Sequence, residues 1–526
     1  MGITDETSEY TLCAVETPND WLLLEEEHKS PYRGGHVFSN ILGIAERIGC
    51  KTVLVERNYI DYEYRDEFSF LYSKAFKNYG SYCTRLHLFG NRYTKIKEIE
   101  NQEVGKLEYL GYTVVRPTSV GKVGRTVIPP KINNPDKEYY LCIAPFKTHL
   151  FGKELTILGT PFIQQDTMVM RCAQACMWMV LRFMEQTQDF SRCSPSDITL
   201  NATKHLSLVG PTVPSDGLTA QQVVNALNNL GFSPILFSKN QFTSAGEEWE
   251  PIKLAHEYLE SQIPVIAVVP NHVVTIIGHT FDHKPSGLRE IVRKKNIISS
   301  SHWVSAFFVH DDALGPYRLL PSPKYKAEKD LDLVPPKEYL YKNTDDIRNI
   351  IVPLPPKVYY RALDVETTSH RLIADGDFLS YVRQEALQGN QTALEFLSSL
   401  QLKTENPLVV RSYFMLSEKY KRILSDEPLC EEMAPTLCRE YKNMRMPRFV
   451  WISEITNVRR LSKEKEVDRT IFGEILIDAT AARYGPAWLA IHMPGNLFLQ
   501  DPLTDEGRHI PIPDDNPYRL LSRQPY

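Results

Sequence analysis

Two cysteines one helical turn apart are the residues of this chain whose types and spacing most directly suggest chemistry. In RCAQACMWMVLRF (residues 171–183), Cys172, Cys176, Met179 and Phe183 recur at intervals of four, three and four, which predicts one face of a helix. Cys172 falls at or just before the first turn, where the helix macrodipole favours a thiolate. Cys176 lies one turn deeper in an apolar stretch, where burial would raise the pKa of its thiol. Cys172 is therefore the candidate nucleophile, and Cys176 is a candidate core residue.

A histidine and an acidic residue stand where they can serve such a thiolate. His272 opens the apolar stretch HVVTIIGH directly after Pro-Asn, so its ring is expected at the mouth of a buried strand. Asp311 and Asp312 end another apolar strand, AFFVHDD, and either carboxylate is a candidate to orient the imidazole. Gln164 or Gln165, just upstream of the cysteine, is a candidate donor of an amide N–H to a developing oxyanion.

In this order, Gln-Cys-His-Asp, the chain resembles the papain-like cysteine peptidases, most closely the bacterial enzymes that remove double-glycine leader peptides during bacteriocin processing. About 170 residues in the middle of the chain carry the resemblance. The matching positions are Cys172, Ala175, Met179 and Leu181 in the first helix, Gly217, Leu218, Thr219, Leu230 and Gly231 in a second helix, and Pro264, Val265, Ile266, His272 and Asp311 in the strands. The flanking segments are similar to those of uncharacterised multidomain bacterial proteins with YxGYxVxRP and GRT stretches.

Three positions depart from the family pattern. Ala173 stands where the family has glycine after the nucleophile. The family's Asp-Pro is replaced by Asp311-Asp312, so both aspartates stay candidates for the third member of the triad. The family's glutamine lies six residues before the cysteine, whereas Gln165 lies seven before it, so Gln164 and Gln165 both stay open.

The resemblance implies a cysteine peptidase that cleaves a peptide bond in a specific protein or peptide through a thioester. Its site would consist of Cys172, His272, Asp311 and Gln165, with no cofactor and no metal. The same residues could instead carry out deamidation or acyl transfer, because all three reactions pass through a thioester. An alternative of another class is an inactive papain-like fold that serves as a regulatory or binding module.

A zinc site is a further alternative for the cysteines. It would use Cys172, Cys176, Cys193 and His205. This set is disfavoured because the cysteine spacing and the later ligands match no pattern of a closed zinc site.

The sequence predicts an α+β protein with a central peptidase domain between two α/β accessory domains. Residues 1–150 form the predicted N-terminal domain, residues 151–330 the papain-like domain and residues 358–526 the C-terminal domain. Residues 331–357, rich in proline and charge, are the predicted connector.

Four basic residues interrupt apolar strands of the predicted N-terminal domain. They are Arg85, His87, Arg116 and Arg125. Charged side chains are rarely buried, so the preferred interpretation places them on the solvated face of a sheet. The alternative is a pocket for an anion or a peptide tail.

Composition narrows the classes of partner and location. The 526 residues carry a net charge of -5 without a long run of Lys or Arg, which argues against nucleic acid as the main partner. No stretch approaches a membrane span, and the acidic start lacks the apolar core of a secretory signal. The nine cysteines do not have the paired spacings of a disulfide framework. We therefore expect a cytoplasmic protein.

Overall fold

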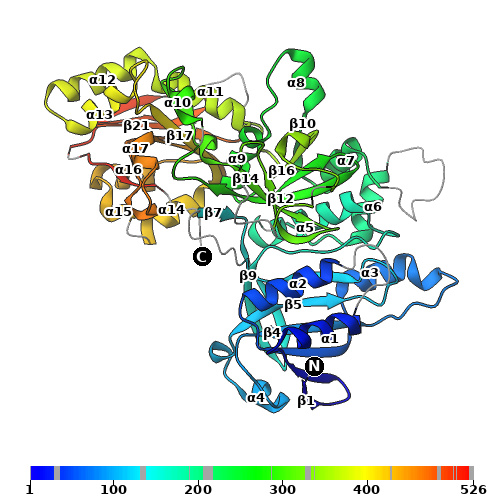
Figure 1. The fold of residues 1–526 in the computed structure, drawn as a ribbon. Helices are drawn as coiled ribbons and strands as arrows, with labels where there is room; N and C mark the ends of the chain where they lie inside the picture. The colour runs from blue at the N-terminus through cyan, green and yellow to red at the C-terminus, as the bar shows by residue number, and fades with distance from the viewer. Residues whose placement is uncertain are drawn as a thin grey trace.

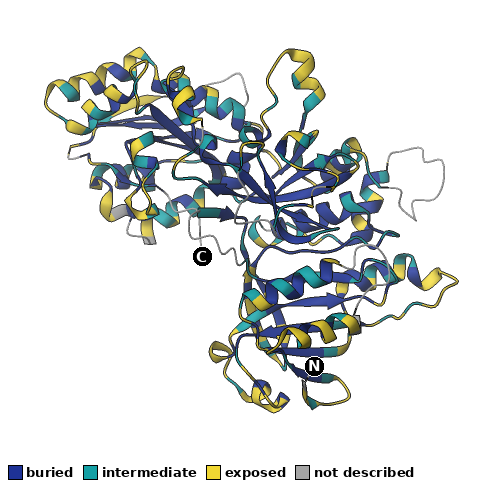
Figure 2. Ribbon diagram, viewed as in Figure 1, coloured by how far each residue is buried: buried dark blue, intermediate teal, exposed yellow. Residues whose placement is uncertain are grey.

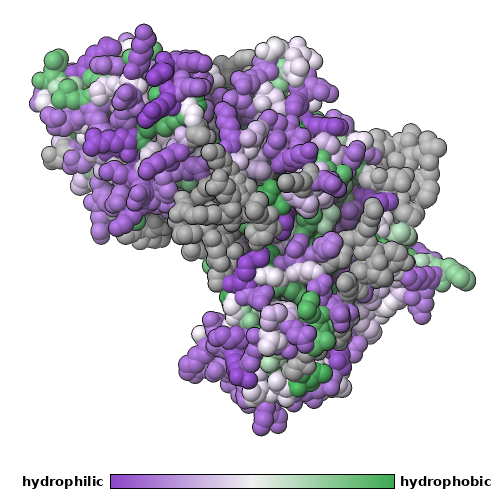
Figure 3. Space-filling view, in the orientation of Figure 1, coloured by the Kyte–Doolittle hydropathy of each residue, from purple (hydrophilic) through white to green (hydrophobic). Residues whose placement is uncertain are grey.

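The computed structural model is a mixed α/β structure with three large sheets that follow one another along the chain (Figure 1). It describes residues 2–28, 36–130, 138–188, 190–204, 217–285, 287–325, 333–336, 338–426, 429–481, 487–501, 503–504, 506–513 and 515–520. The strands of the sheets are mostly buried, and the helices expose one side (Figure 2). On the face in Figure 3, hydrophobic residues gather in small patches within a largely hydrophilic surface.

The N-terminal sheet is an antiparallel meander in the order β1-β2-β3-β4-β5-β6. Its strands are β1 (Gly2–Glu6), β2 (Tyr10–Ala14), β3 (Thr52–Tyr59), β4 (Cys83–Phe89), β5 (Tyr109–Val115) and β6 (Val123–Val127). The accompanying helices are α1 (Pro18–His28), α2 (His36–Arg47), α3 (Tyr62–Phe70) and α4 (Ile96–Asn101). Helix α2 buries an apolar stripe of residues at helical spacing and reaches the edge of the central sheet.

The basic residues of this sheet correct the preferred interpretation, because Arg85, His87 and Arg116 are buried. Arg85 Nε lies 2.7 Å from Glu56 Oε2. Arg116 is 1% exposed and lies 2.9 Å from Glu67 Oε1. Buried guanidinium groups are stable only with such partners, so these residues hold the interior together and do not face solvent.

The central sheet has the order β10-β16-β11-β12-β14-β15, with β7 also paired to β12. Its strands are β7 (Glu138–Leu141), β10 (Ser233–Ser238), β11 (Val265–Val269), β12 (His272–Phe281), β14 (Ala306–Asp311), β15 (Gly315–Pro321) and β16 (Asn349–Leu354). The helices of this part are α5 (Cys172–Gln188), α6 (Pro195–Thr203), α7 (Ala220–Asn229), α8 (Lys239–Ala245), α9 (Pro251–Glu260) and α10 (Leu288–Val292). The hairpin of β8 (Ala144–Leu150) and β9 (Lys153–Gly159) follows β7 in the chain and precedes α5.

The C-terminal sheet has the order β13-β17-β18-β20-β21-β22-β23. Its strands are β13 (Ile297–Ser299), β17 (Leu408–Leu416), β18 (Phe449–Asn457), β20 (Gly473–Asp478), β21 (Trp488–Met493), β22 (Asn496–Gln500) and β23 (Gly507–Pro511), and β19 (Thr470–Ile471) pairs with β24 (Tyr518–Arg519). The helices are α11 (Ala362–Ile373), α12 (Gly376–Leu387), α13 (Gln391–Ser399), α14 (Ser417–Asp426), α15 (Leu429–Glu432), α16 (Pro435–Asn443) and α17 (Val458–Leu461). Cys438 of α16 is disulfide-bonded.

Three strands belong to a different sheet from the one expected for their segment of the chain. β7, from the predicted N-terminal domain, pairs with β12 of the central sheet. β13, from the predicted peptidase domain, pairs with β17 of the C-terminal sheet. β16 lies within the predicted connector, but its buried residues place it between β10 and β11. Helix α9 contacts both β12 and β17, so it lies between the central and C-terminal sheets.

Candidate active site

The candidate nucleophile begins helix α5, as the spacing predicted. Ala175 N–H donates to the carbonyl of Arg171, and Arg171 N–H donates to Gln174 Oε1 at 3.2 Å, which starts the helix at Cys172. The loop before the helix is fixed by the buried carboxylate of Asp166, which accepts the backbone N–H of Met170 at 2.7 Å. Cys172 therefore lies in the first turn, at the positive end of the helix dipole.

The two cysteines differ in their surroundings. Cys172 is partly exposed, whereas Cys176 is fully buried and its thiol donates to the carbonyl of Val273 on β12 at 3.2 Å. Burial, followed by the nearby Asp312 carboxylate, raises the pKa of the Cys176 thiol well above its ordinary value. Cys176 therefore packs α5 against the sheet, in agreement with the prediction that it is a core residue.

A tight hairpin presents His272 to the nucleophile. Val269 pairs with His272, which leaves a turn of two residues between β11 and β12. Asn271 occupies this turn with a φ of 56°, a left-handed conformation that asparagine tolerates better than most residues. The Cys172 thiol lies close enough to the His272 imidazole to help raise the pKa of the imidazole, after the larger effect of Asp311. The structure thus brings together the cysteine and the histidine selected from the sequence.

The antiparallel register of β12 and β14 brings an acid to the same histidine. Thr275 pairs with His310, so the end of β14 lies beside the start of β12. Asp311 Oδ1 is 3.0 Å from His272 Nε2, while Asp312 Oδ1 is 3.5 Å from the same nitrogen. Because Nε2 is bound to Asp311, Nδ1 is the nitrogen left for the thiol.

The two aspartates differ in protonation. Burial raises the pKa of Asp312 to about 7, with the Asp311 charge adding to the effect of burial. Burial alone would also raise the pKa of Asp311, but His272 and the hydrogen-bond donors around it lower it instead. Burial by itself would lower the pKa of His272, yet the Asp311 carboxylate raises it well above the ordinary value. Asp311 is therefore the ionised partner of the imidazole, and Asp312 is a neighbour that is about half protonated near pH 7.

Two tyrosines that sequence reasoning missed hold Asp311 in place. Tyr341 Oη donates to Asp311 Oδ2 at 2.7 Å, and Tyr339 Oη donates to the same oxygen at 3.1 Å. Ala313 and Leu314 add backbone N–H donors to Oδ1 at 2.8 and 3.1 Å. The tyrosines belong to the predicted connector, where their i, i+2 spacing in EYLYK was the available signal.

The structure also separates the two glutamines. Gln164 is buried, and its side-chain oxygen accepts the backbone N–H of Val123 on β6 at 3.2 Å. Gln165 is half-buried, and its backbone N–H lies beside the Asp312 carboxylate. Gln164 is thus tied to the N-terminal sheet, and the backbone of Gln165 adjoins Asp312.

His272, Asp311 and Asp312 form a compact group of a kind that can bind a metal ion. Asp311, however, already faces N–H and O–H donors on both of its oxygens, which oppose coordination of a cation. The structure does not support the alternative zinc site. Among the described residues, Cys172, Cys176 and Cys193 belong to no group of potential metal ligands, and His205 lies outside those residues.

No model of a protein family matches the chain, and no curated protein shows significant similarity to it. None of the described helices is both long enough and apolar enough to cross a bilayer.

Proposed function

We propose that the central part of the chain is a papain-like cysteine peptidase domain that cleaves a peptide bond in a specific protein or peptide. The observation that carries the proposal is the chain of contacts from Cys172 through His272 to Asp311. A thiol at a helix N-terminus, an imidazole beside it and an ionised carboxylate behind the imidazole are the three parts that thiol nucleophiles require. Their origin on α5, β12 and β14 agrees with the helix-against-sheet arrangement expected of a papain-like domain.

In the first half of the proposed reaction, the Cys172 sulfur attacks the carbonyl carbon of the scissile bond. The proton of the thiol passes to His272, and Asp311 stabilises the imidazolium that results. The C–N bond then breaks, His272 gives the proton to the leaving amine, and the acyl group stays on Cys172 as a thioester.

In the second half, a water molecule attacks the thioester. His272 takes a proton from this water, the C–S bond breaks, and the thiolate of Cys172 is restored with release of a carboxylic acid. The backbone N–H of Cys172 and the side-chain amide of Gln165 are the proposed donors to the oxyanion in both halves. Gln164 is not proposed for this role, because its side-chain oxygen and its backbone are engaged with the N-terminal sheet.

The proposed enzyme needs no cofactor, and we propose the cytoplasm as its location. Specificity for one partner is consistent with the two large flanking parts, which offer surfaces beyond the cleavage site.

The proposal is tested by the reactivity of Cys172 toward a thiol-directed electrophile. The full-length protein is treated briefly with iodoacetamide near pH 7, and the labelled cysteine is identified by mass spectrometry. We expect selective labelling of Cys172 that falls by about two orders of magnitude or more in His272→Ala, in line with the contribution of a positioned base.

Cys193→Ser is the matched control, because Cys193 is also a partly exposed free thiol but lies outside the triad. This variant should label like the wild type. Labelling of Cys172 that is slow and indifferent to His272 would contradict the peptidase and favour an inactive fold that serves as a binding module.

A further inference from the structure

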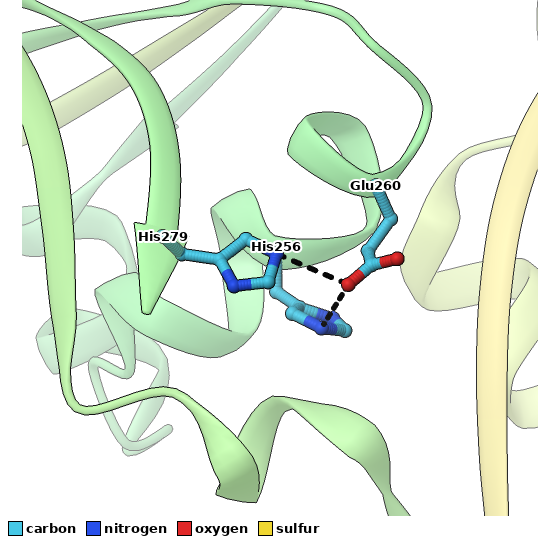
Figure 4. A group of neighbouring side chains, drawn as sticks. All are labelled: His256, Glu260 and His279. Atoms are coloured by element: carbon cyan, nitrogen blue, oxygen red, sulfur yellow. Dashed lines mark ion pairs between the residues drawn. The ribbon is translucent and has the colours of Figure 1, made fainter. Parts of the chain in front are cut away.

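A second group of titratable side chains lies buried on the side of the central sheet that faces the C-terminal sheet. His256 and Glu260 are one turn apart on α9, and His279 of β12 points toward them (Figure 4). Glu260 Oε1 is 3.3 Å from His256 Nε2 and 3.0 Å from His279 Nε2. All three side chains are at most 1% exposed. Three donor atoms of the kind that bind metals thus converge in the interior.

The contact of the other ring nitrogen decides which nitrogen of His279 is available to a metal ion. Nδ1 of His279 lies 2.9 Å from the carbonyl oxygen of Thr280. A carbonyl only accepts hydrogen bonds, so Nδ1 carries a hydrogen, and Nε2 is the nitrogen that faces Glu260. Nε2 makes no hydrogen bond within the described residues, although Glu260 Oε1 is close. A nitrogen and a carboxylate oxygen at this separation need either a proton or a metal ion between them.

The surrounding charges also favour a cation. Arg411 of β17 donates a hydrogen bond from Nε to Glu260 Oε2 at 2.9 Å and another from Nη1 to Glu454 Oε2 at 2.7 Å. Two carboxylates and one guanidinium leave one negative charge in a water-poor interior, where an uncompensated charge is costly. The Thr280 carbonyl behind His279 and Arg411 behind Glu260 are the kind of outer partners that orient metal ligands.

We propose that His256, Glu260 and His279 bind a zinc ion. Zinc binds histidine nitrogen and carboxylate oxygen at about 2.0–2.1 Å in a tetrahedral arrangement, which separates neighbouring ligand atoms by about 3.3 Å. The observed separations of 3.0 and 3.3 Å match this spacing. A water molecule completes the shell, as in other zinc sites with three protein ligands.

The role of this zinc is structural, because its ligands are buried away from any substrate. It joins α9 to β12, the strand that also carries His272, and through Arg411 it connects both to β17 of the C-terminal sheet. The inference is independent of the proposed peptidase activity and concerns the junction of the two sheets.

Metal analysis of the full-length protein tests the site. The protein is dialysed against a weak chelator, and zinc is measured by inductively coupled plasma mass spectrometry. We expect about one zinc per chain in the wild type and a loss of at least about 80% in His256→Gln and His279→Gln, because each variant removes one of the three protein ligands. His492→Gln is the matched control, because His492 is a buried histidine 2.9 Å from one carboxylate, Asp515, and belongs to no group of three potential ligands among the described residues. The His492→Gln variant should retain its zinc.

X-ray absorption at the zinc edge of the wild type provides a readout that does not depend on how well the variants fold. We expect scattering from two imidazoles and oxygen, without sulfur. A wild type that neither retains zinc nor binds added Co²⁺ with a tetrahedral absorption spectrum would overturn the proposal and leave a proton between the ligands. Sulfur in the shell, or zinc retained in both histidine variants, would equally overturn it by placing the ion elsewhere.

Discussion

Replacing Asp311 by asparagine is expected to separate the electrostatic role of this residue from its role in folding. Oδ1 of Asp311 accepts two backbone N–H groups and His272 Nε2, so the amide oxygen of asparagine should take this position. The amide nitrogen would then face the hydroxyls of Tyr339 and Tyr341, which can rotate to accept a hydrogen bond. The fold should survive, while the negative charge beside the imidazole is lost.

The size of the effect follows from the distance between the charges. His272 Nε2 and Asp311 Oδ1 are 3.0 Å apart and buried. Opposite charges at about 4 Å between their centres contribute about 4 kcal/mol at an effective dielectric constant of about 20. This energy corresponds to a loss of about a thousandfold in the population of the thiolate–imidazolium pair. We therefore expect alkylation of Cys172 at pH 7 to slow by about this factor in Asp311→Asn.

The adjacent Asp312 supplies the control. Its carboxyl has a pKa of about 7, so it is about half protonated near pH 7, and its Oδ1 lies farther from His272 Nε2 (3.5 Å) than that of Asp311 (3.0 Å), so Asp312→Asn should slow the reaction less than Asp311→Asn does. The assay is the second-order rate of Cys172 alkylation by iodoacetamide, measured by mass spectrometry between pH 5 and pH 9. If Asp312→Asn slowed the reaction more than Asp311→Asn, the assignment of the orienting acid would be reversed.

Three further outcomes are expected. Tyr341→Phe removes a hydrogen bond to the ionised Asp311, so the free energy of unfolding should fall by about 1.5–3 kcal/mol. A melting temperature equal to that of the wild type would contradict this role of Tyr341. Cys176→Ala should lower the melting temperature and leave most of the reactivity of Cys172, because the removed thiol packs α5 against β12. Loss of Cys172 labelling in a folded Cys176→Ala variant would contradict the assignment of Cys176 as a core residue. Burial lowers the pKa of His87 from 6.5 to about 4. On acidification the unfolded chain therefore binds a proton at this residue before the folded protein does. The free energy of unfolding should fall by about 3 kcal/mol as the pH drops from 6.5 to about 4. His87→Gln should reduce the difference in melting temperature between pH 7 and pH 4.5, and an unchanged difference would show that other groups cause it.

The parts of the fold that could be predicted are those with long, regular apolar patterns. The stretch after Cys172 forms α5, and the apolar runs after Ile263 and from His272 form β11 and β12. Burial of one helix face places apolar residues at helical spacing, and burial of both strand faces gives a continuous apolar run. Both patterns can be seen in a short stretch of sequence. The residues chosen for chemistry lie together because they begin or end such elements.

The remaining features depend on contacts between distant segments. β16 contains Pro353 and is followed by Pro355 and Pro356, and only its pairing with β10 and β11 makes it a central strand. The hydroxyl of Tyr341 becomes part of the site because the chain returns to Asp311 after β15. Arg116 is buried because Glu67 and three carbonyls surround it. No local pattern identifies such partners, so composition favoured the wrong, solvated interpretation.

The contacts of Arg116 limit how this protein can be divided and recombined. Its guanidinium donates to the Gln164 carbonyl at 2.6 Å, and Thr126 of β6 exchanges backbone hydrogen bonds with Phe162. The segment that leads to Cys172 is therefore anchored in the N-terminal sheet. A fragment cut at residue 151 would carry the nucleophile, the histidine and the acid, yet it would lose the anchor that sets the backbone of Gln164 and Gln165. The smallest segment that could carry the catalytic residues into another protein consequently includes the N-terminal sheet. A fusion is expected to succeed only when the N-terminal sheet and the central sheet are transferred together.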